Sequence, residues 1–397
     1  MKEAPENEDN HDLSQLLWTP DGACLTYSLS ETHPTDRFAF REASSLSHRN
    51  LLMPRPWSLL AIALLSFPSS VALAAEPIKV GVIGLDNYQA VAYTHLFNDP
   101  KAQGELTGIK VVAAYPGKGS PDIEESYKEI PRWIDQMKKL GVEMVDSPEE
   151  VLKRVDAVIV MTVDGRAHLN NLKPVFAAKK PVYIGRPLAA SLEDTVEIFR
   201  LAAESKTPIF SCSQHRFSPG FIGMRNHEEV GTVLGADVYG GCQREPHHPD
   251  LIWQGLHGIE TLYTIMGPGC VSVTRASTDK ADVVTGTWND GRVGVYRGIR
   301  EGAVKYSAVV FGTKGVSTAG IYGHGVPVKG LVPTKDKYMG YEGLGIEIAK
   351  FFKTGTPPVT AEETKEIFAF MAAADESKKL DGAPVKLEAM LAKTAKK

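Results

Sequence analysis

The chain has 397 residues, 43% of them hydrophobic, and a formal net charge of −4. A chain of this length can form two domains with sizeable cores. The charge balance and the lack of a basic cluster in the sequence exclude the usual kind of nucleic-acid-binding protein.

The first 75 residues differ from the rest. Residues 1–52 are polar and have no sustained helical or strand period. Met53 opens a basic start, which is followed by an apolar segment over residues 59–73 and the small-residue site Ala72-Leu73-Ala74. This order is typical of a secretory signal peptide, and the apolar segment is too short and too interrupted for a comfortable membrane span. We expect residues 1–52 to be an untranslated or disordered extension and 53–75 to be a signal peptide. The mature protein would then be exported to the periplasm without a stable membrane span. The alternatives are a genuine extension with an internal anchor, and a cytoplasmic location.

Strand and helix patterns alternate through the first half of the mature chain. Apolar runs that predict strands cover residues 78–83, 110–114, 142–145, 157–163, 182–184 and 208–212. Helical patterns lie between them, one of them over residues 123–140 with Pro131 inside it. This alternation predicts an α/β domain with a doubly wound parallel sheet of the Rossmann type.

Residues 156–189 are the most informative stretch. A strand pattern, a polar turn with Thr162 and Asp164, a helical pattern and a second strand ending at Gly185-Arg186-Pro187 follow one another within about 30 residues, as in a βαβ unit. Ligands of open parallel sheets lie beyond the carboxyl ends of the strands. We therefore expect the turn, including His168, and the Gly185-Arg186 corner to border a ligand site.

The pattern changes after residue 220. Strand-like runs cover residues 233–242, 271–278, 282–288, 294–299 and 303–311, and Asn289-Asp290-Gly291 is a strong hairpin signal. A helical pattern covers residues 362–379. Consecutive hairpins predict a second domain, residues 212–397, with a large, mostly antiparallel sheet.

The block over residues 156–189 resembles the Gfo/Idh/MocA oxidoreductase family, in which the equivalent strand ends in a Glu-Lys-Pro or Asp-Lys-Pro corner. The similarity of pattern extends from about residue 78 to residue 385, so the chain resembles a divergent, exported member. The resemblance implies that residues 76–211 bind NAD or NADP and that residues 212–397 bind substrate and form a homodimer or homotetramer. It also implies a small sugar or polyol substrate.

The first strand is followed by Gly84, Leu85, Asp86 and Asn87 rather than by the full G-x-G-x-x-G fingerprint of dinucleotide sites. Asp86 takes the place of the second glycine. A carboxylate facing a diphosphate costs on the order of 1 kcal/mol in water and about 4 kcal/mol at an effective dielectric of 20. We expect Asp86 to point away instead and to cap the following helix.

The second strand of such a domain normally ends in an acidic residue that holds the adenine ribose. Here the loop offers Lys118 and Ser120, which can hold a 2′-phosphate, so NADP is slightly favoured over NAD. An ordinary glycine-rich surface loop is the alternative.

Arg186 stands where the resemblance places a lysine. Lysine can help to move the proton of the reacting hydroxyl, whereas arginine stays charged and accepts protons poorly. Arg186 is therefore expected to position a substrate carbonyl, hydroxyl or carboxylate. An alternative is a surface arginine at a strand end.

His257 matches the histidine that the family places against the nicotinamide as an acid or base. Glu260 is three residues further on, on the same helical face, and is expected to orient the ring. Trp253 replaces an aspartate that the family often has there, and it can stack on a sugar. Arg216 and His247 are further candidates for the cleft. The pair His247-His248 lacks a third ligand at a suitable spacing, so no metal site is predicted.

These residues predict an NAD(P)-dependent oxidoreductase that transfers hydride to or from a sugar or polyol. Two alternatives remain open at this stage. One is an exported carbohydrate-binding or redox-inactive member, because the fingerprint, the corner lysine and the aspartate are all altered. The other is an NAD-dependent glycoside hydrolase, which would use the same site.

Overall fold

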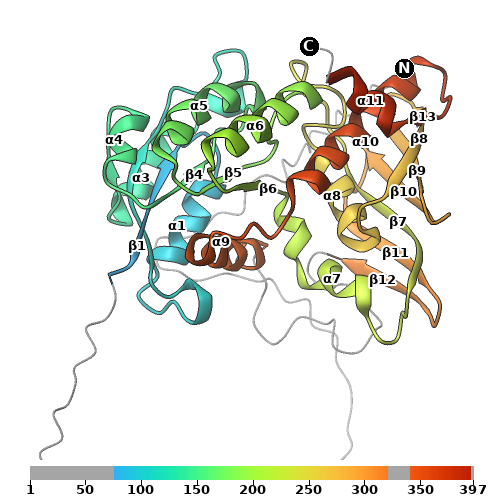
Figure 1. The fold of residues 1–397 in the computed structure, drawn as a ribbon, viewed down its shortest axis with the longest axis horizontal. Helices are drawn as coiled ribbons and strands as arrows, with labels where there is room; N and C mark the ends of the chain where they lie inside the picture. The colour runs from blue at the N-terminus through green and yellow to red at the C-terminus, as the bar shows by residue number, and fades with distance from the viewer. Residues whose placement is uncertain (1–75, 321–339, 395–397) are drawn as a thin grey trace, which may run out of the picture. The chain divides into compact units, whose positions relative to one another are not determined.

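A computed structural model describes residues 76–320 and 340–394 (Figure 1). The expected extension and signal peptide lie outside these residues. Within the two described ranges no helix is both long and apolar enough to cross a membrane. Cys212, Cys242 and Cys270 are all buried and free.

The first sheet is parallel, with the strand order β3-β2-β1-β4-β5-β6. The order reverses between β1 and β4, which is where open α/β sheets bind ligands. The predicted Rossmann-type architecture is thereby confirmed. Its strands are β1 (Ile78–Ile83), β2 (Ile109–Tyr115), β3 (Glu143–Met144), β4 (Ala157–Val160), β5 (Val182–Ile184) and β6 (Ile209–Ser211).

Two apolar cores cover the two faces of this sheet. Within β4, Val158 and Val160 belong to one core and Ile159 to the other, as the two-residue period of a strand requires. Helices α4 (Pro148–Leu152), α5 (Gly165–Ala178) and α6 (Leu192–Ser205) pack on the first side. Helices α1 (Gln89–Asn98), α3 (Ile130–Lys139) and α9 (Glu342–Thr354) pack on the second.

Two helical expectations differ from the structure. The helix expected over residues 123–140 is divided into α2 (Glu124–Tyr127) and α3, with Pro131 in the first turn of α3. Proline is tolerated there because the first helical N–H groups have no intrahelical partner. Helix α9 was not predicted. It follows the second sheet in the chain yet packs beside α1 on the first one (Figure 1).

The second sheet has the order β12-β11-β7-β10-β9-β8-β13 and is antiparallel except for the pair β7–β10. The predicted hairpin is present between β9 and β10, with Gly291 at φ 86°. The strands are β7 (Val233–Gly241), β8 (Cys270–Ser277), β9 (Ala281–Trp288), β10 (Val293–Ile299), β11 (Ser307–Gly312), β12 (Val316–Gly320) and β13 (Val385–Lys386).

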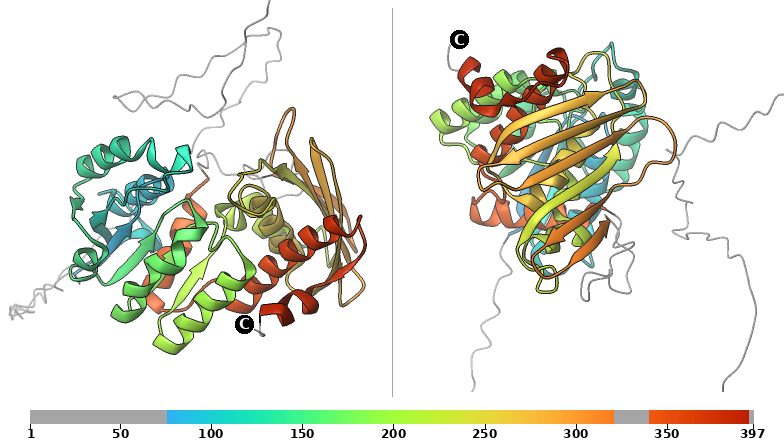
Figure 2. Two further views of the ribbon diagram at one scale, coloured as in Figure 1. Left: turned by 90° about the horizontal axis from the view of Figure 1, so that it is seen from above. Right: turned by 90° about the vertical axis from the view of Figure 1, so that its right-hand side faces the viewer.

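Helices α8 (Gly255–Met266), α10 (Ala361–Lys379) and α11 (Leu387–Thr394) lie on one face of the second sheet (Figure 2). Every residue of α8 is buried, because this helix lies between the sheet and the Rossmann domain. The opposite face carries exposed Val293, Phe311 and Val316. The homodimer or homotetramer expected from the resemblance stays a prediction.

Candidate functional site

The turn after β1 keeps one requirement of a dinucleotide site. Gly84 has φ +91°, and a Cβ there would approach the backbone nitrogen of Thr162 to 2.7 Å. A side chain would therefore strain both the backbone and the contact with the segment after β4. The turn leads directly into α1, whose first N–H, that of Gln89, donates to Asn87 Oδ1 at 2.7 Å.

Asp86 does not cap α1, which corrects the sequence-based expectation. Its carboxylate is 4% exposed and accepts hydrogen bonds from the Val163 N–H at 3.1 Å and from Ser126 Oγ at 2.7 Å. Burial raises the pKa of Asp86 to about 6, although these hydrogen bonds oppose the shift. The carboxylate lies between the segments that follow β2 and β4 and is hydrogen bonded to both.

The segment after β2, residues 117–126, crosses the carboxyl end of β1, and we call it the strap. Ser120 Oγ donates to Asp164, which follows β4. Arg166 donates to both oxygens of Asp122 at 2.8 and 2.9 Å. Because β1 lies between β2 and β4 in the sheet, these bonds hold the strap over the switch point.

Contacts between histidines and carboxylates join the strap and Asp164 to the loop after β7. His248 lies 3.2 Å from Asp164 Oδ1 through Nε2 and 2.6 Å from Glu245 through Nδ1. His247 lies 2.6 Å from Glu245 and 3.4 Å from Asp122. Burial acts to raise the pKa of Asp164, but hydrogen bonds from its partners outweigh burial and hold the pKa well below its ordinary value. Asp164, predicted to touch the cofactor, instead joins the two domains.

Two other residues that were predicted to bind cofactor are buried inside the protein. Leu85 is a fully buried core residue. His168 is also fully buried, and its ring nitrogens lie 3.0 Å from Leu188 O and 2.9 Å from Thr162 O. Its position fixes the segments that follow β4 and β5 and does not present the ring to a ligand. Lys118 is exposed, and the hydroxyl of Ser120 is already engaged by Asp164.

A cluster of rings and one guanidinium lies at the ends of β5 and β6. Arg186 follows β5 and donates through Nη1 to Trp253 O at 3.2 Å, whereas its Nε is enclosed without a hydrogen-bond partner. His257 on α8 shares a 2.6 Å hydrogen bond with Ser213 Oγ through Nδ1. The rings of His215 and His257 have centroids 4.7 Å apart, and Tyr306 lies edge-on to His215 at 4.3 Å.

Both histidines of this cluster are neutral near neutral pH. Burial lowers the pKa of His215 to about 3, and the nearby charge of Arg186 acts in the same direction. Burial and Arg186 also hold the pKa of His257 well below its ordinary value. A neutral imidazole can accept a proton. If Nδ1–H donates to Ser213, Nε2 is the accepting atom.

The predicted pairing of His257 with Glu260 is not formed, and Ser213 takes its place. Glu260 instead binds Arg216, with Nε 2.9 Å and Nη2 2.8 Å from Oε2. Arg216 also contacts Glu363 of α10 at 2.7 Å. Both side chains are buried, and their charged groups are already occupied by this ion-pair cluster. Arg216 was predicted to contact substrate and Glu260 to orient His257; in the structure the two residues bind each other instead.

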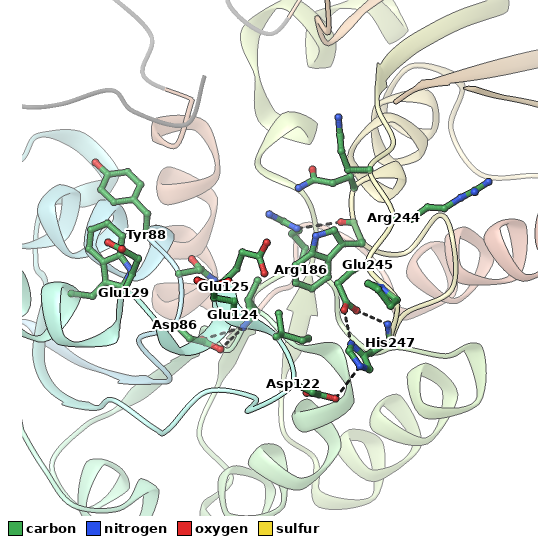
Figure 3. A pocket seen from close by; sticks show the side chains of 18 residues that line it. Asp86, Tyr88, Asp122, Glu124, Glu125, Glu129, Arg186, Arg244, Glu245 and His247 are labelled. Carbon is green, nitrogen blue, oxygen red and sulfur yellow. Dashed lines mark hydrogen bonds and ion pairs between the residues drawn. The ribbon is translucent and has the colours of Figure 1, made fainter. Parts of the chain in front are cut away.

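A pocket of about 630 Å³ opens between the strap and the loop after β7 (Figure 3). Four of the predicted residues line it: Asp86, Asn87, Arg186 and Trp253. His247 lines it as well, but it is held by Glu245 and Asp122. Acidic side chains dominate the remaining wall: Asp122, Glu124, Glu125, Glu129 and Glu245. Among the described residues there is no group of three or more His, Cys, Asp or Glu arranged to hold a metal ion.

Residues 78–211 match the model of a family described as an oxidoreductase family with an NAD-binding Rossmann fold. The Rossmann domain is thus similar in sequence to the Gfo/Idh/MocA family. No curated protein matches the chain.

Solved structures of other proteins share the fold at low sequence identity. A probable dehydrogenase from Thermotoga maritima is 20% identical, with a TM-score of 0.61 over 78% of this chain and 99% of its own. A myo-inositol dehydrogenase from Lactobacillus casei, solved with NAD(H) and myo-inositol, is 17% identical, with a TM-score of 0.59 over 78% and 96%. An Agrobacterium radiobacter oxidoreductase, solved with NAD+, L-tartaric acid and magnesium, is 15% identical, with a TM-score of 0.61 over 79% and 99%.

The residues of the turn after β1 fit a dinucleotide in one respect and oppose it in another. Gly84 and the N-terminus of α1 provide the close backbone approach and the N–H groups that a diphosphate needs. The strap and the buried Asp86 carboxylate lie over the same edge of the sheet. The turn therefore fits the cofactor of this family on the condition that the strap moves away from Asp164.

Sequence reasoning missed three residues of the ring cluster. Ser213 and His215 directly follow β6, and their place after a strand end was a usable signal. Tyr306 precedes β11 in the second domain, and its sequence neighbourhood gives no indication that it faces His215.

Proposed function

We propose that this protein is an NAD(P)-dependent oxidoreductase whose substrate is a sugar or polyol. The observation that carries this proposal is the neutral His257 imidazole, held by Ser213 beside Arg186, at the carboxyl edge of a domain from an NAD-binding family. A nicotinamide cofactor, when bound, accepts or supplies the hydride. Gly84 and the N-terminus of α1 would hold its diphosphate.

The chain's own residues have separate roles in this proposal. Arg186 binds the substrate oxygen through guanidinium N–H groups that are not committed to a carboxylate. His257 removes the hydroxyl proton through Nε2 when the substrate is oxidised and returns it in the reverse direction. Ser213 fixes the plane of the ring. Trp253, on the pocket wall, packs against the sugar face.

The cofactor step is tested on protein purified from cells that contain both dinucleotides. Denaturation should release near-stoichiometric NAD or NADP, or the apo protein should bind one of them at micromolar concentration. His257→Ala should then lower kcat by about 10²–10⁴-fold while leaving cofactor affinity unchanged, because the residue acts on a proton in the reaction. The matched control is His95→Ala, on the exposed side of α1, which should leave kcat unchanged.

One observation favours the rival proposal, a carbohydrate-binding protein without redox chemistry. The strap occupies the crevice that a dinucleotide would cross. No released cofactor and no binding at millimolar NAD or NADP would favour this rival and end the oxidoreductase proposal. The glycoside-cleaving alternative predicts cofactor release together with cleavage of a glycoside.

A further inference from the structure

Arg186 is a cation without an anionic partner. Among the described residues no carboxylate forms an ion pair with it, and its only hydrogen bond in the structure is to the Trp253 carbonyl. The titratable groups that act on the pKa of Arg186 are tyrosines, which are neutral at ordinary pH. Burial lowers the pKa of Arg186, but guanidinium remains charged at any working pH. Arg186 is partly buried and lines the pocket. A charge withdrawn from water without a counter-ion is destabilising, and an anionic ligand would compensate it.

Unsatisfied polar atoms lie next to this charge. Arg186 Nε and His215 Nδ1 are both buried and have no hydrogen-bond partner. His215 in turn contacts His257 and Tyr306, so the unpaired atoms belong to one cluster. Most buried polar groups in proteins are hydrogen bonded, and exceptions require an explanation. An acceptor oxygen of a ligand would satisfy Arg186 Nε, whereas His215 Nδ1 can donate or accept according to its tautomer.

The other arginines of this region are already neutralised. Arg166 is bound to Asp122 and Asp164, and Arg244 pairs with Asp250 at 3.4 Å. Arg216 is held between Glu260 and Glu363. Arg186 alone among these four is without a carboxylate partner in the described part of the chain, which distinguishes a ligand-binding arginine from a structural one.

The acidic pocket wall does not prevent an anion from reaching Arg186. Glu245 is held by His247 and His248. Glu124 and Glu129 pair with lysine and arginine on the exposed surface, where salt screens them further. The single charge of Arg186 matches a monoanion, whereas a phosphate dianion would leave an excess negative charge beside these acids.

We propose that the ligand of this cleft is a polyhydroxy acid whose carboxylate binds Arg186 and whose hydroxyls bind the acidic wall. The inference rests on the proposed function only in treating this cleft as the substrate site, and it names the substrate class. Carboxylate and guanidinium can form two parallel hydrogen bonds, a geometry that a lysine at this corner would not provide.

Carboxylate binding has a consequence for His257. The charge of Arg186 opposes protonation of His257, so a bound carboxylate that neutralises Arg186 should make the imidazole more basic. The bound carboxylate would thus make His257 a better acceptor for the proton of a hydroxyl on the same ligand. The pKa of His257, followed by NMR, should rise when the ligand is added.

The test is calorimetric titration of the full chain, without added cofactor, with two acids and their neutral counterparts. The acids are D-glucuronate and D-gluconate, and the neutral probes are D-glucose and D-glucitol. At least one acid should bind about tenfold or more tightly than its neutral counterpart, as expected for a charge-assisted pair. Arg186→Gln should remove this difference, and Arg186→Lys should restore part of it. Arg244→Gln, on the same wall, should leave it unchanged.

If Arg186→Gln fails to fold, the comparison of acid and neutral ligands on the wild-type protein still tests the inference. Equal affinity for acid and neutral probe, no binding of either acid at millimolar concentration, or tighter binding of inorganic phosphate would each overturn the inference. A separate NAD(P) titration distinguishes the two proposals. Binding of an acid without binding of a cofactor supports this inference and ends the oxidoreductase proposal. Turnover of neutral polyols but not of acids supports the oxidoreductase proposal and overturns this inference.

Discussion

At the scale of single residues, Asp86 has a structural role at a position where a dinucleotide-binding motif has a glycine. The residue stands in place of a fingerprint glycine, and its carboxylate is buried against Val163 N–H and Ser126 Oγ. The buried position is unfavourable for a charge and raises the pKa of Asp86 to about 6 from an ordinary value of 3.8. The protonated form is therefore the one that folding favours.

We predict that Asp86 makes folding stability depend on pH. Because the folded-state pKa is raised, its contribution is fully present below pH 3.8 and is lost as pH rises through about 6. Two pKa units correspond to about 3 kcal/mol. Asp86→Asn should therefore gain stability relative to the native chain by up to about 3 kcal/mol between pH 4 and pH 7.5. Urea unfolding at both pH values measures this. A pH-independent difference between the two proteins would contradict it.

At the scale of elements, the strap determines access to the crevice. Its contacts with Asp164 and Arg166 join the segments after β2 and β4 over the end of β1. His247 and His248 extend this network into the second domain. Burial acts to lower the pKa of His248, but the carboxylates of Asp164 and Glu245 raise it above its ordinary value. The strap is thus held by charge-assisted bonds from both domains.

We predict that loosening the strap strengthens dinucleotide binding. Ser120→Ala with Asp122→Asn removes one hydrogen bond to a charged group and weakens an exposed ion pair, which together contribute roughly 1–3 kcal/mol. NAD or NADP should then bind about five- to a hundredfold more tightly, measured by fluorescence titration. The control is Ser205→Ala, whose hydroxyl bonds only within α6 and the residues that follow it. Unchanged or weaker affinity in the double variant would show that the strap does not compete with cofactor.

At the scale of the whole molecule, buried ion pairs link the chain segments that meet at α8. Arg216 follows the last Rossmann strand, and its partners Glu260 and Glu363 come from α8 and α10. Burial raises the pKa of Glu260, while the Arg216 guanidinium opposes that shift. Removal of Glu260 would leave Arg216 paired with Glu363 alone and would leave the buried Nε and Nη2 of Arg216 without their acceptor.

We predict that Glu260→Ala lowers the free energy of unfolding by about 1–3 kcal/mol, the cost of leaving buried hydrogen-bond donors of Arg216 unsatisfied. Glu362→Ala, one helical position before Glu363 and 79% exposed at its side chain, should change it by less than about 1 kcal/mol. Thermal and urea denaturation measure both values. Loss of turnover in Glu260→Ala without loss of stability would return Glu260 to a catalytic role.

The local sequence determined the alternation of strands and helices in the first domain and the hairpin in the second. Continuous apolar runs such as residues 157–163, separated by helical periods, required a parallel sheet buried on both faces, and Asn289-Asp290-Gly291 required a hairpin. Arg186, expected at a strand end, lines a pocket, as does Trp253, which the family resemblance indicated. These features depend on short-range periodicity and turn geometry, which neighbouring residues specify.

Only the tertiary structure decided which polar groups meet. Ser213 rather than Glu260 holds His257, because α8 brings its histidine against the end of β6 and its glutamate against Arg216. The strap reaches Asp164, 44 residues away in sequence, because the sheet order places β1 between them. Hydrogen-bond partners are selected by distance in space, and segments far apart in sequence come together only when the sheet and its covering helices pack.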